Sequence, residues 1–271
     1  ISKSYDEKVL IRDFTYIFLK NDRIGFVGAN GSGKTTLMKI IDQRIRPDEG
    51  TVTIGQTIKI GYYTQEIENT KDAGIAYMDP DEKVIDYIKN TAEYVRTKDG
   101  LVSASNMLER FLFPSSQQYS PIGKLSGGEK RRLNLLRVLM EAPNVLILDE
   151  PTNDLDIRTL TILEDYLDNY EGIVITVSHD RYFLDRVVNR IFAFEEDGKI
   201  CQYEGGYTDY VNRLAEEGKV PAGHILDAKN DTTTSVDSVE KENLTSSMDT
   251  WKRERKLKFT LRVLGCIYDI G

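Results

Sequence analysis

The sequence contains few cysteines and no long apolar segment. Cys201 and Cys266 are the two cysteines among 271 residues, and their spacing fits neither a metal site nor a disulfide framework, which favours a reducing compartment. The apolar runs have the length of a strand, as at Val145 to Leu148, far short of the roughly 20 residues that a membrane-spanning helix needs. We therefore predict a cytoplasmic chain with no membrane insertion.

An excess of basic residues and a leader segment are also missing. The formal net charge of -8 argues against a generally basic nucleic-acid-binding surface, so any contact with a polyanion must be local. The sequence starts at Ile1 with no initiator methionine, basic n-region or signal-type apolar core, and we expect it to be a piece of a longer protein. With 40% apolar and 30% charged residues, its composition predicts a globular domain.

Three runs rich in Val, Ile and Leu each end in polar residues, at 23–27, 144–148 and 172–177. Because they are continuously apolar and do not alternate, they predict buried parallel strands. A helix between the last two would supply the crossover that parallel strands require, and apolar residues recur there at helical spacing. The sequence thus predicts an α/β fold whose strands gather polar groups at one edge of the sheet.

The segment between the first two of these strands predicts a helical subdomain at about 80–142. It carries two apolar stripes at helical spacing, and Pro114 is expected to stop the second stripe. The folded domain is predicted over 1–217, followed by a polar linker over 218–250 and a basic segment over 251–271. The first stripe contains Val84, Ile85, Ile88, Ala92 and Val95, and the second contains Met107, Leu108, Phe111 and Leu112.

A phosphate-binding loop is written at 28–36 as GANGSGKTT, between a predicted strand and an amphipathic helix. Such loops turn backbone N–H groups onto the β-phosphate of a nucleotide, and the helix N-terminus adds partial positive charge. Lys34 is expected to reach the β- and γ-phosphates, and Thr35 to ligate Mg²⁺. We assign nucleotide binding to Gly28, Asn30, Gly31, Ser32, Gly33, Lys34, Thr35 and Thr36.

Polar residues that follow the other strands predict the rest of a phosphoryl-transfer site. Asp149 can hold Mg²⁺ through its water shell, and Glu150 can accept a proton from an attacking water. His179 can hydrogen-bond a γ-phosphate and orient that water. Each has a structural alternative, because carboxylates often cap turns and a lone histidine at a strand end is often only structural. Gln65 can reach both metal and water, although one glutamine in a loop is only suggestive.

A second anion site is predicted at LSGGE, residues 125–129. Ser126 and Glu129 have the spacing of a capping box at the start of a helix, so the Ser126 hydroxyl, the amides of Gly127 and Gly128 and the helix dipole converge. The structural alternative is a well-formed helix start. Two anion sites for one nucleotide are explained if each serves a different ATP, so that one chain supplies two half-sites.

In their order along the chain, these motifs resemble the ATP-binding cassette (ABC) superfamily over nearly all of 1–217. The resemblance makes Gln65 the Q-loop, LSGGE the signature, LILDEPTNDLD the Walker B strand and D-loop, and His179 the switch. It implies a P-loop core with a parallel sheet, an antiparallel β part and a helical signature subdomain, and ATP hydrolysis with Mg²⁺. It also implies that Tyr5 stacks on adenine, that Glu150 is the catalytic carboxylate, and that Asn153 to Asp156, with Asp154, face a partner cassette.

Three further segments, SHDRYFLDRV, YEGGYTDY and NDLDI, look like the ABC-F subfamily of soluble tandem-cassette ATPases associated with the ribosome. The best match is the second cassette, in the branch with a C-terminal extension. The resemblance therefore implies a second cassette and the ribosome as partners. The chain departs from the family in having Asp6 where a glycine is usual, in a shortened first strand, and in lacking heptads after 251–260, where we expect a truncated extension.

Other functions stay open at this point. An ABC transporter subunit would use the same chemistry while its helical subdomain grips a permease. An ATP-switched DNA-binding protein would use the basic cluster Trp251 to Lys258, which alternatively is a solvated helix face. A decayed, inactive cassette is disfavoured because Lys34, Asp149, Glu150 and His179 are all present.

Overall fold

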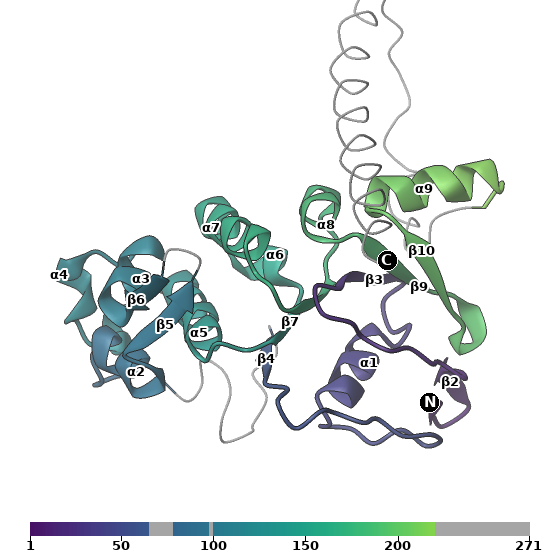
Figure 1. The fold of residues 1–271 in the computed structure, drawn as a ribbon, viewed down its shortest axis with the longest axis horizontal. Helices are drawn as coiled ribbons and strands as arrows, with labels where there is room; N and C mark the ends of the chain where they lie inside the picture. Colours follow the sequence, from purple (N-terminus) through teal and green to yellow (C-terminus); the bar gives the residue numbers. More distant parts are fainter. Residues whose placement is uncertain (65–77, 98–99, 220–271) are drawn as a thin grey trace, which may run out of the picture. The chain divides into compact units, whose positions relative to one another are not determined.

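The computed structural model describes residues 1–64, 78–97 and 100–219, except the side chain of Asp154. The chain divides into two compact units, 1–225 and 226–271, and the description below concerns the first (Figure 1). Gln65, the predicted polar linker and the basic segment with Trp251 lie outside the described residues. The domain boundaries expected at 217 and 250 therefore stay predictions.

A six-stranded sheet forms the centre of this unit, and its neighbouring strands run parallel except for one antiparallel pair at an edge. The three strands predicted from continuous apolar runs are β3, β8 and β7, which lie side by side in the sheet. Their parallel pairing confirms the α/β prediction. The order across the sheet is β10 (Ile200–Glu204), β9 (Arg190–Phe194), β3 (Arg23–Gly28), β8 (Ile173–Val177), β7 (Val145–Asp149) and β4 (Ile60–Tyr63).

Each face of the sheet has its own buried core. On one face, α1 (Lys34–Ile41) packs with Phe26, Ile147 and Ile175. On the other face, Leu146, Leu148 and Val174 join the core that α7, α8 and α9 cover. Figure 1 shows α1 on one side of the sheet and α7 and α8 on the opposite side. The three helices that cover the second core span Ile157–Asp168 (α7), Arg181–Val187 (α8) and Tyr207–Glu216 (α9).

An antiparallel hairpin precedes the sheet and forms the predicted antiparallel part together with the β9–β10 edge. It consists of β1 (Lys3–Tyr5) and β2 (Lys8–Ile11), and it packs against the short helix η3 (Glu196–Gly198), where Arg12 N–H donates to the Gly198 carbonyl at 2.8 Å. Asp6 lies in the turn with φ 51°. The turn thus uses the left-handed conformation that favours glycine, and aspartate is one of the residues that tolerate it.

The insertion between β4 and β7 contains the expected helices. It also contains a β-hairpin, which the sequence did not predict. Its helices pack together and onto β4 in the larger of the two cores, and a short helix, α6 (Pro151–Asp154), follows β7. The elements of the insertion are α2 (Val84–Thr91), β5 (Tyr94–Thr97), β6 (Gly100–Ser103), α3 (Ala104–Arg110), α4 (Ser115–Gln118), η2 (Ile122–Lys124) and α5 (Gly127–Met140).

Two details of the predicted helical stripes are wrong. Val95 was placed on the first helix, but α2 ends at Thr91 and Val95 lies on β5, where it pairs with Val102 and is buried. Leu112 was placed on the second helix, but α3 ends at Arg110 and Leu112 is exposed with φ 60°. The helix therefore stops before Pro114 acts, because Leu112 has turned into the left-handed region.

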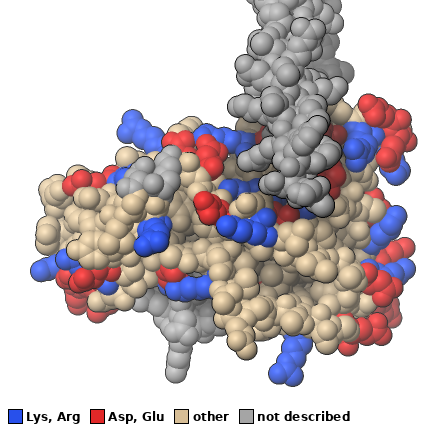
Figure 2. Space-filling view, viewed as in Figure 1, with Lys and Arg blue, Asp and Glu red and all other residues tan. Residues whose placement is uncertain are grey.

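None of the helices in the described part of the chain is long and apolar enough to span a membrane. Lysine and arginine are interspersed with aspartate and glutamate over the face shown in Figure 2 and do not form one basic field.

Candidate nucleotide-binding site

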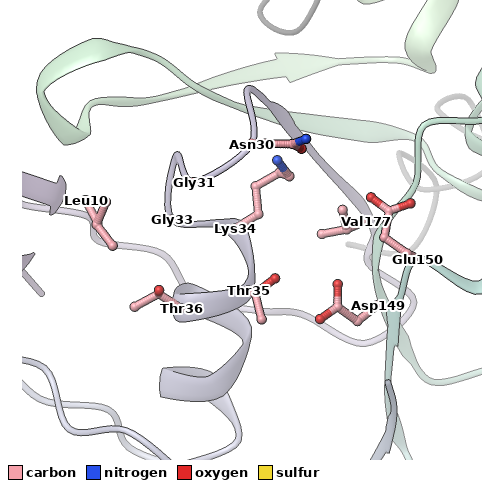
Figure 3. Close-up of a pocket in the computed structure, with 10 residues that line it drawn as sticks. All are labelled: Leu10, Asn30, Gly31, Gly33, Lys34, Thr35, Thr36, Asp149, Glu150 and Val177. Carbon is pink, nitrogen blue, oxygen red and sulfur yellow. The ribbon is translucent and has the colours of Figure 1, made fainter. Parts of the chain in front are cut away.

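The glycine loop surrounds a cavity of about 240 Å³ at the junction of β3 and α1. Gly33 has φ 108°, and a Cβ atom there would lie 2.9 Å from the Leu10 carbonyl, so no larger residue fits without moving the hairpin. Figure 3 shows the loop on one side and the two acidic residues at the end of β7, Asp149 and Glu150, on the other. The lining residues are Leu10, Asn30, Gly31, Gly33, Lys34, Thr35, Thr36, Asp149, Glu150 and Val177.

Lys34 is the buried cation of this cavity. Its Nζ donates to the carbonyls of Gly28 at 2.8 Å and Ala29 at 2.9 Å, which folds the loop around the ammonium group. Burial lowers the pKa of Lys34, while Glu150 and Asp149 oppose that shift. A buried ammonium that donates to neutral carbonyls can be stabilised further by phosphate oxygens.

Thr35 and Asp149 lie on facing sides of the same cavity (Figure 3). The Tyr62 hydroxyl contacts Asp149 Oδ2 at 3.4 Å, and burial together with Asp149 raises the pKa of Tyr62 well above its usual range. Among the residues described, no three or more His, Cys, Asp or Glu side chains are grouped so that they could hold a metal ion by themselves. One threonine and one carboxylate suit Mg²⁺, which proteins bind through few side chains and the substrate phosphates.

Glu150 lines the cavity and is the single residue between β7 and α6. It occupies the N-cap position of α6 without a side-chain capping hydrogen bond, and its φ of 52° is a strained conformation of the kind that occurs at functional sites. Its Oε1 lies 3.1 Å from His179 Nε2, and its Oε2 is buried without a hydrogen-bond partner. Burial raises the pKa of Glu150, with Asp149 adding to the shift and His179 and Lys34 opposing it.

His179 is held beside Glu150 by the turn between β8 and α8. The Ser178 hydroxyl bonds Thr152 at 2.9 Å and accepts the Asp180 N–H at 3.0 Å. Asp180 in turn caps α8 by accepting the N–H groups of Tyr182 and Phe183. The imidazole remains 60% exposed, so it can bond Glu150 and still face a ligand.

The signature residues form the predicted capping box, and they lie away from this cavity. The Ser126 hydroxyl accepts the Glu129 N–H, and the Glu129 carboxylate accepts the N–H and the hydroxyl of Ser126 at 2.8 Å. Gln117 from α4 donates to the other carboxylate oxygen at 2.6 Å. The Ser126 N–H lowers the pKa of Glu129. None of the four residues 126–129 is among those that line the cavity.

Tyr5 and the D-loop residue Asp156 each contact other residues of this chain. Tyr5 is 46% exposed at the end of β1, and the Lys3 ammonium lies 5.2 Å from its ring centroid, so one ring face is occupied by a cation. Asp156 caps α7 through Thr159 and bonds Arg132 Nη1 at 3.3 Å. The side chain of Asp154 and all of Gln65 lie outside the described residues, so their expected roles stay predictions.

Several residues near the cavity were missed by sequence reasoning. Lys8 from β2 donates to the Gly31 carbonyl at 2.8 Å, and Leu10 and Val177 line the cavity. No local motif marks these positions, because the hairpin and β8 reach the loop only through the tertiary fold. Their contact with the loop could have been inferred only from a prediction of strand order.

The comparisons with known proteins identify the family of the chain. The family model described as "ABC transporter" matches residues 11–153. The chain is 51% identical over 91% of its length to "Uncharacterized ABC transporter ATP-binding protein YfmR" of Bacillus subtilis, covering 37% of that protein. It is 40% identical over 74% of its length to "ATP-binding protein Uup" of Escherichia coli, covering 31%, and 36% identical over 78% to "Energy-dependent translational throttle protein EttA" of the same organism, covering 36%. The chain thus spans about a third of these curated relatives.

Solved structures share the fold at low sequence identity. "Structure of ATP binding subunit of ABC transporter" has a TM-score of 0.61 and 16% identity, and the alignment covers 81% of this chain and 92% of that one. "Dimeric structure of a post-hydrolysis state of the ATP-binding cassette MJ0796 bound to ADP and Pi" has a TM-score of 0.55 and 20% identity, with 75% and 96% covered. The fold, the phosphate loop and the matching family model together show that the chain belongs to the ABC transporter family as an ATP-binding cassette of the ABC ATPase type.

Proposed function

We propose that this chain is the second nucleotide-binding cassette of an ABC-F ATPase, and that it hydrolyses ATP as a nucleotide-driven switch on the ribosome. The observation that carries the hydrolytic part is the environment of Glu150. Its carboxylate is largely buried, one oxygen lies against His179, and the other is buried without a hydrogen-bond partner. Glu150 lines the same cavity as Lys34. Such a carboxylate is suited to accept a proton from a water directed at a γ-phosphate.

The remaining lining residues provide the other parts of phosphoryl transfer. Backbone N–H groups of the loop and the Lys34 ammonium would hold the β- and γ-phosphates. Thr35 and Asp149, with Gln65, would hold Mg²⁺, which neutralises phosphate charge when bound. His179 would bond the γ-phosphate while its contact with Glu150 orients both side chains. Tyr5 would present its free ring face to adenine.

The signature residues supply the second half of a composite site on another cassette. A Cβ atom at Gly127 or Gly128 would have nothing within 4 Å among the described residues, and neither glycine has positive φ. The fold of this chain therefore gives no reason for glycine at either position. Close approach of a ligand held by a partner does, because a bare backbone lets N–H groups contact phosphate. We infer that ATP closes two such cassettes and that hydrolysis opens them.

The ribosomal part of the proposal rests on the ABC-F-like segments and on the relatives. One relative is named a translational throttle protein, and the segments SHDRYFLDRV and YEGGYTDY are those that distinguish the subfamily. The transporter alternative is supported by the wording of the family description and of the YfmR name. A DNA contact has no support from the described surface, since its candidate segment starts at Trp251.

Pairing is tested by the dependence of ATP turnover on concentration. The 271-residue chain should hydrolyse ATP slowly when dilute, and its rate per chain should rise with concentration as copies associate, because each site needs a signature from another cassette. Analytical ultracentrifugation with Mg²⁺ and ATP should show the dimer over the same range. A constant rate per chain from a protein that stays monomeric would refute the two-half-site proposal. Cosedimentation with ribosomes in ATP, compared with ADP, separates the ABC-F function from the transporter function.

A further inference from the structure

The segment YEGGYTDY, residues 203–210, docks α9 onto the helix that follows the switch histidine. The ring of Tyr203 packs against the ring of Tyr210 with centroids 4.9 Å apart, and both residues are buried. Thr208 N–H donates to Asp185 Oδ1 at 2.7 Å, and the Thr208 hydroxyl donates to Oδ2 of the same carboxylate. Asp185 lies on α8, which begins two residues after His179. The segment therefore ties α9 to α8 at one carboxylate.

The close contact between the two helices depends on a glycine. A Cβ atom at Gly206 would lie 2.7 Å from Asp185 Oδ1, so a side chain there would displace the carboxylate that holds Thr208. Asp209 completes the helix start, because its carboxylate accepts the Gly206 N–H at 3.2 Å. The motif thus sets the position of Tyr207, the first residue of α9, relative to α8.

Tyr207 reaches the nucleotide site from this dock. A small cavity of about 50 Å³ lies beside the phosphate loop, and its lining includes Gly28 and Lys34 from the loop, Ser178 and His179 from the switch, and Tyr207 from α9. Tyr207 is partly buried against the larger core. It is the residue of α9 that lines this cavity together with the loop and the switch.

We propose that Tyr207 is a positioning residue for the switch, and that through it α9 and the nucleotide site are coupled. Because the ring lines the same cavity as His179, it would limit the side-chain positions open to the imidazole, so that the imidazole meets an incoming γ-phosphate in one orientation. This inference rests on the proposed function, because it assigns Tyr207 to the response of His179 to nucleotide. Coupling is reciprocal, so nucleotide binding would also bias the position of α9 against α8.

The test uses the fact that the chain has two histidines, His179 and His224. With ¹³C-labelled histidine, the imidazole signals of the 271-residue chain are recorded without nucleotide and with Mg²⁺ and a non-hydrolysable ATP analogue. The wild-type His179 signal should move on binding, while His224 serves as an internal reference. Tyr207→Ala should reduce the nucleotide-induced shift of His179 at least about twofold, because the imidazole then samples several orientations. Tyr207→Phe should retain the shift, because it keeps the ring.

Tyr182→Ala is the matched control. This tyrosine lies on α8, close to His179 in the sequence, but it is 81% exposed. It should leave the nucleotide-induced shift unchanged. Thr208→Val provides a second variant that loosens the dock without touching the cavity, and it should reduce the shift in the same direction as Tyr207→Ala. Melting temperatures and analogue affinities measured alongside exclude misfolding and lost binding as causes.

The outcomes separate this inference from the proposed function. A full nucleotide-induced shift in Tyr207→Ala, or an equal loss in Tyr182→Ala, would overturn the positioning role while the ATPase proposal stands. A wild-type chain that binds no analogue would refute the proposed function and this inference with it. In turnover assays, Tyr207→Ala should lower kcat by about three- to tenfold with a smaller change in KM, as expected for a residue that acts on the reacting geometry and not on ground-state binding.

Discussion

His179 Nε2 lies 3.1 Å from Glu150 Oε1, and the two residues follow neighbouring parallel strands, β8 and β7. The contact joins two groups that are 29 positions apart in the sequence through a single step across the sheet. One carboxylate oxygen of Glu150 is thus engaged by His179, whereas the other is buried without a hydrogen-bond partner.

Removing the negative charge of Glu150 should slow the chemical step and spare binding. Glu150→Gln keeps the shape of the side chain and its contact with His179, but an amide cannot accept the proton of the attacking water. Turnover should fall by about 10²–10⁴, the range for a positioned general base, with ATP affinity within about threefold of the wild type. Single-turnover hydrolysis and equilibrium binding of the same preparation measure the two effects.

Glu164→Gln is the matched control for that substitution, because Glu164 pairs with Arg186 on the surface between α7 and α8. It should hydrolyse ATP at the wild-type rate. Equal losses in both variants would indicate a general effect of charge, and wild-type turnover in Glu150→Gln would remove Glu150 from the role of base.

Glu150→Gln should also stabilise the fold, by an amount that depends on pH. Burial raises the pKa of Glu150 in the folded chain, so the native state binds the carboxyl proton more tightly than the unfolded state does. The contribution of Glu150 to the free energy of unfolding therefore falls as pH rises from the ordinary carboxyl pKa through the raised pKa. Below the ordinary carboxyl pKa both states are protonated, and Glu150→Gln should melt at the wild-type temperature. Above the raised pKa the variant should melt higher.

Thermal melts of the two proteins at a series of pH values measure this difference. Asp149, Lys34 and His179 face the carboxylate, so Asp149→Asn provides the comparison for a neighbouring charge. A difference that is largest in acid and vanishes at neutral pH would contradict the assigned direction of the pKa shift.

The local parts of this fold were accessible from the sequence. The strands β3, β7 and β8 are buried on both faces, so they are written as continuous apolar runs, and the loop that follows β3 carries its own pattern of glycines and lysine. The capping box of α5 needs only residues three apart. Each of these features is decided within a short window, which is why reasoning from spacing predicts it.

The parts that failed are decided elsewhere in the fold. Val95 fits a helical stripe that starts at Val84, yet it pairs with Val102 across a hairpin, and nothing within the stripe distinguishes the two. The contact of Lys8 with Gly31 and the approach of Tyr207 to His179 join segments far apart along the chain. Such contacts follow from strand order and helix packing, which a single sequence specifies only through the whole structure.

Lys34 should be needed for binding more than for stability. Lys34→Met removes the ammonium group that bonds the Gly28 and Ala29 carbonyls, and it also removes a buried charge whose desolvation opposes folding. ATP affinity should fall more than about tenfold, as expected for loss of a charge-assisted contact to phosphate worth about 1.5–3 kcal/mol, with little change in melting temperature. Lys20→Met, at an exposed surface pair with Glu171, should bind ATP normally.

The signature glycines offer the sharpest separation between folding and pairing. Gly128 lies in the first turn of α5, has no positive φ, and faces open space within this chain. Alanine is a better helix former than glycine by up to about 1 kcal/mol, so Gly128→Ala should leave the isolated chain equally stable or more stable in urea unfolding. If the site accepts the γ-phosphate of a partner, the added methyl group should at the same time reduce ATP-dependent association and turnover at least about tenfold.

Ser126→Ala gives the complementary control. It removes the cap of α5 as well as the hydroxyl, so it should cost about 0.5–2 kcal/mol of unfolding free energy together with turnover. Gly128→Ala therefore loses activity without losing stability, whereas Ser126→Ala loses both. Normal association and turnover in Gly128→Ala would mean that LSGGE is only a helix start, and the second half-site would have to be sought elsewhere on the chain.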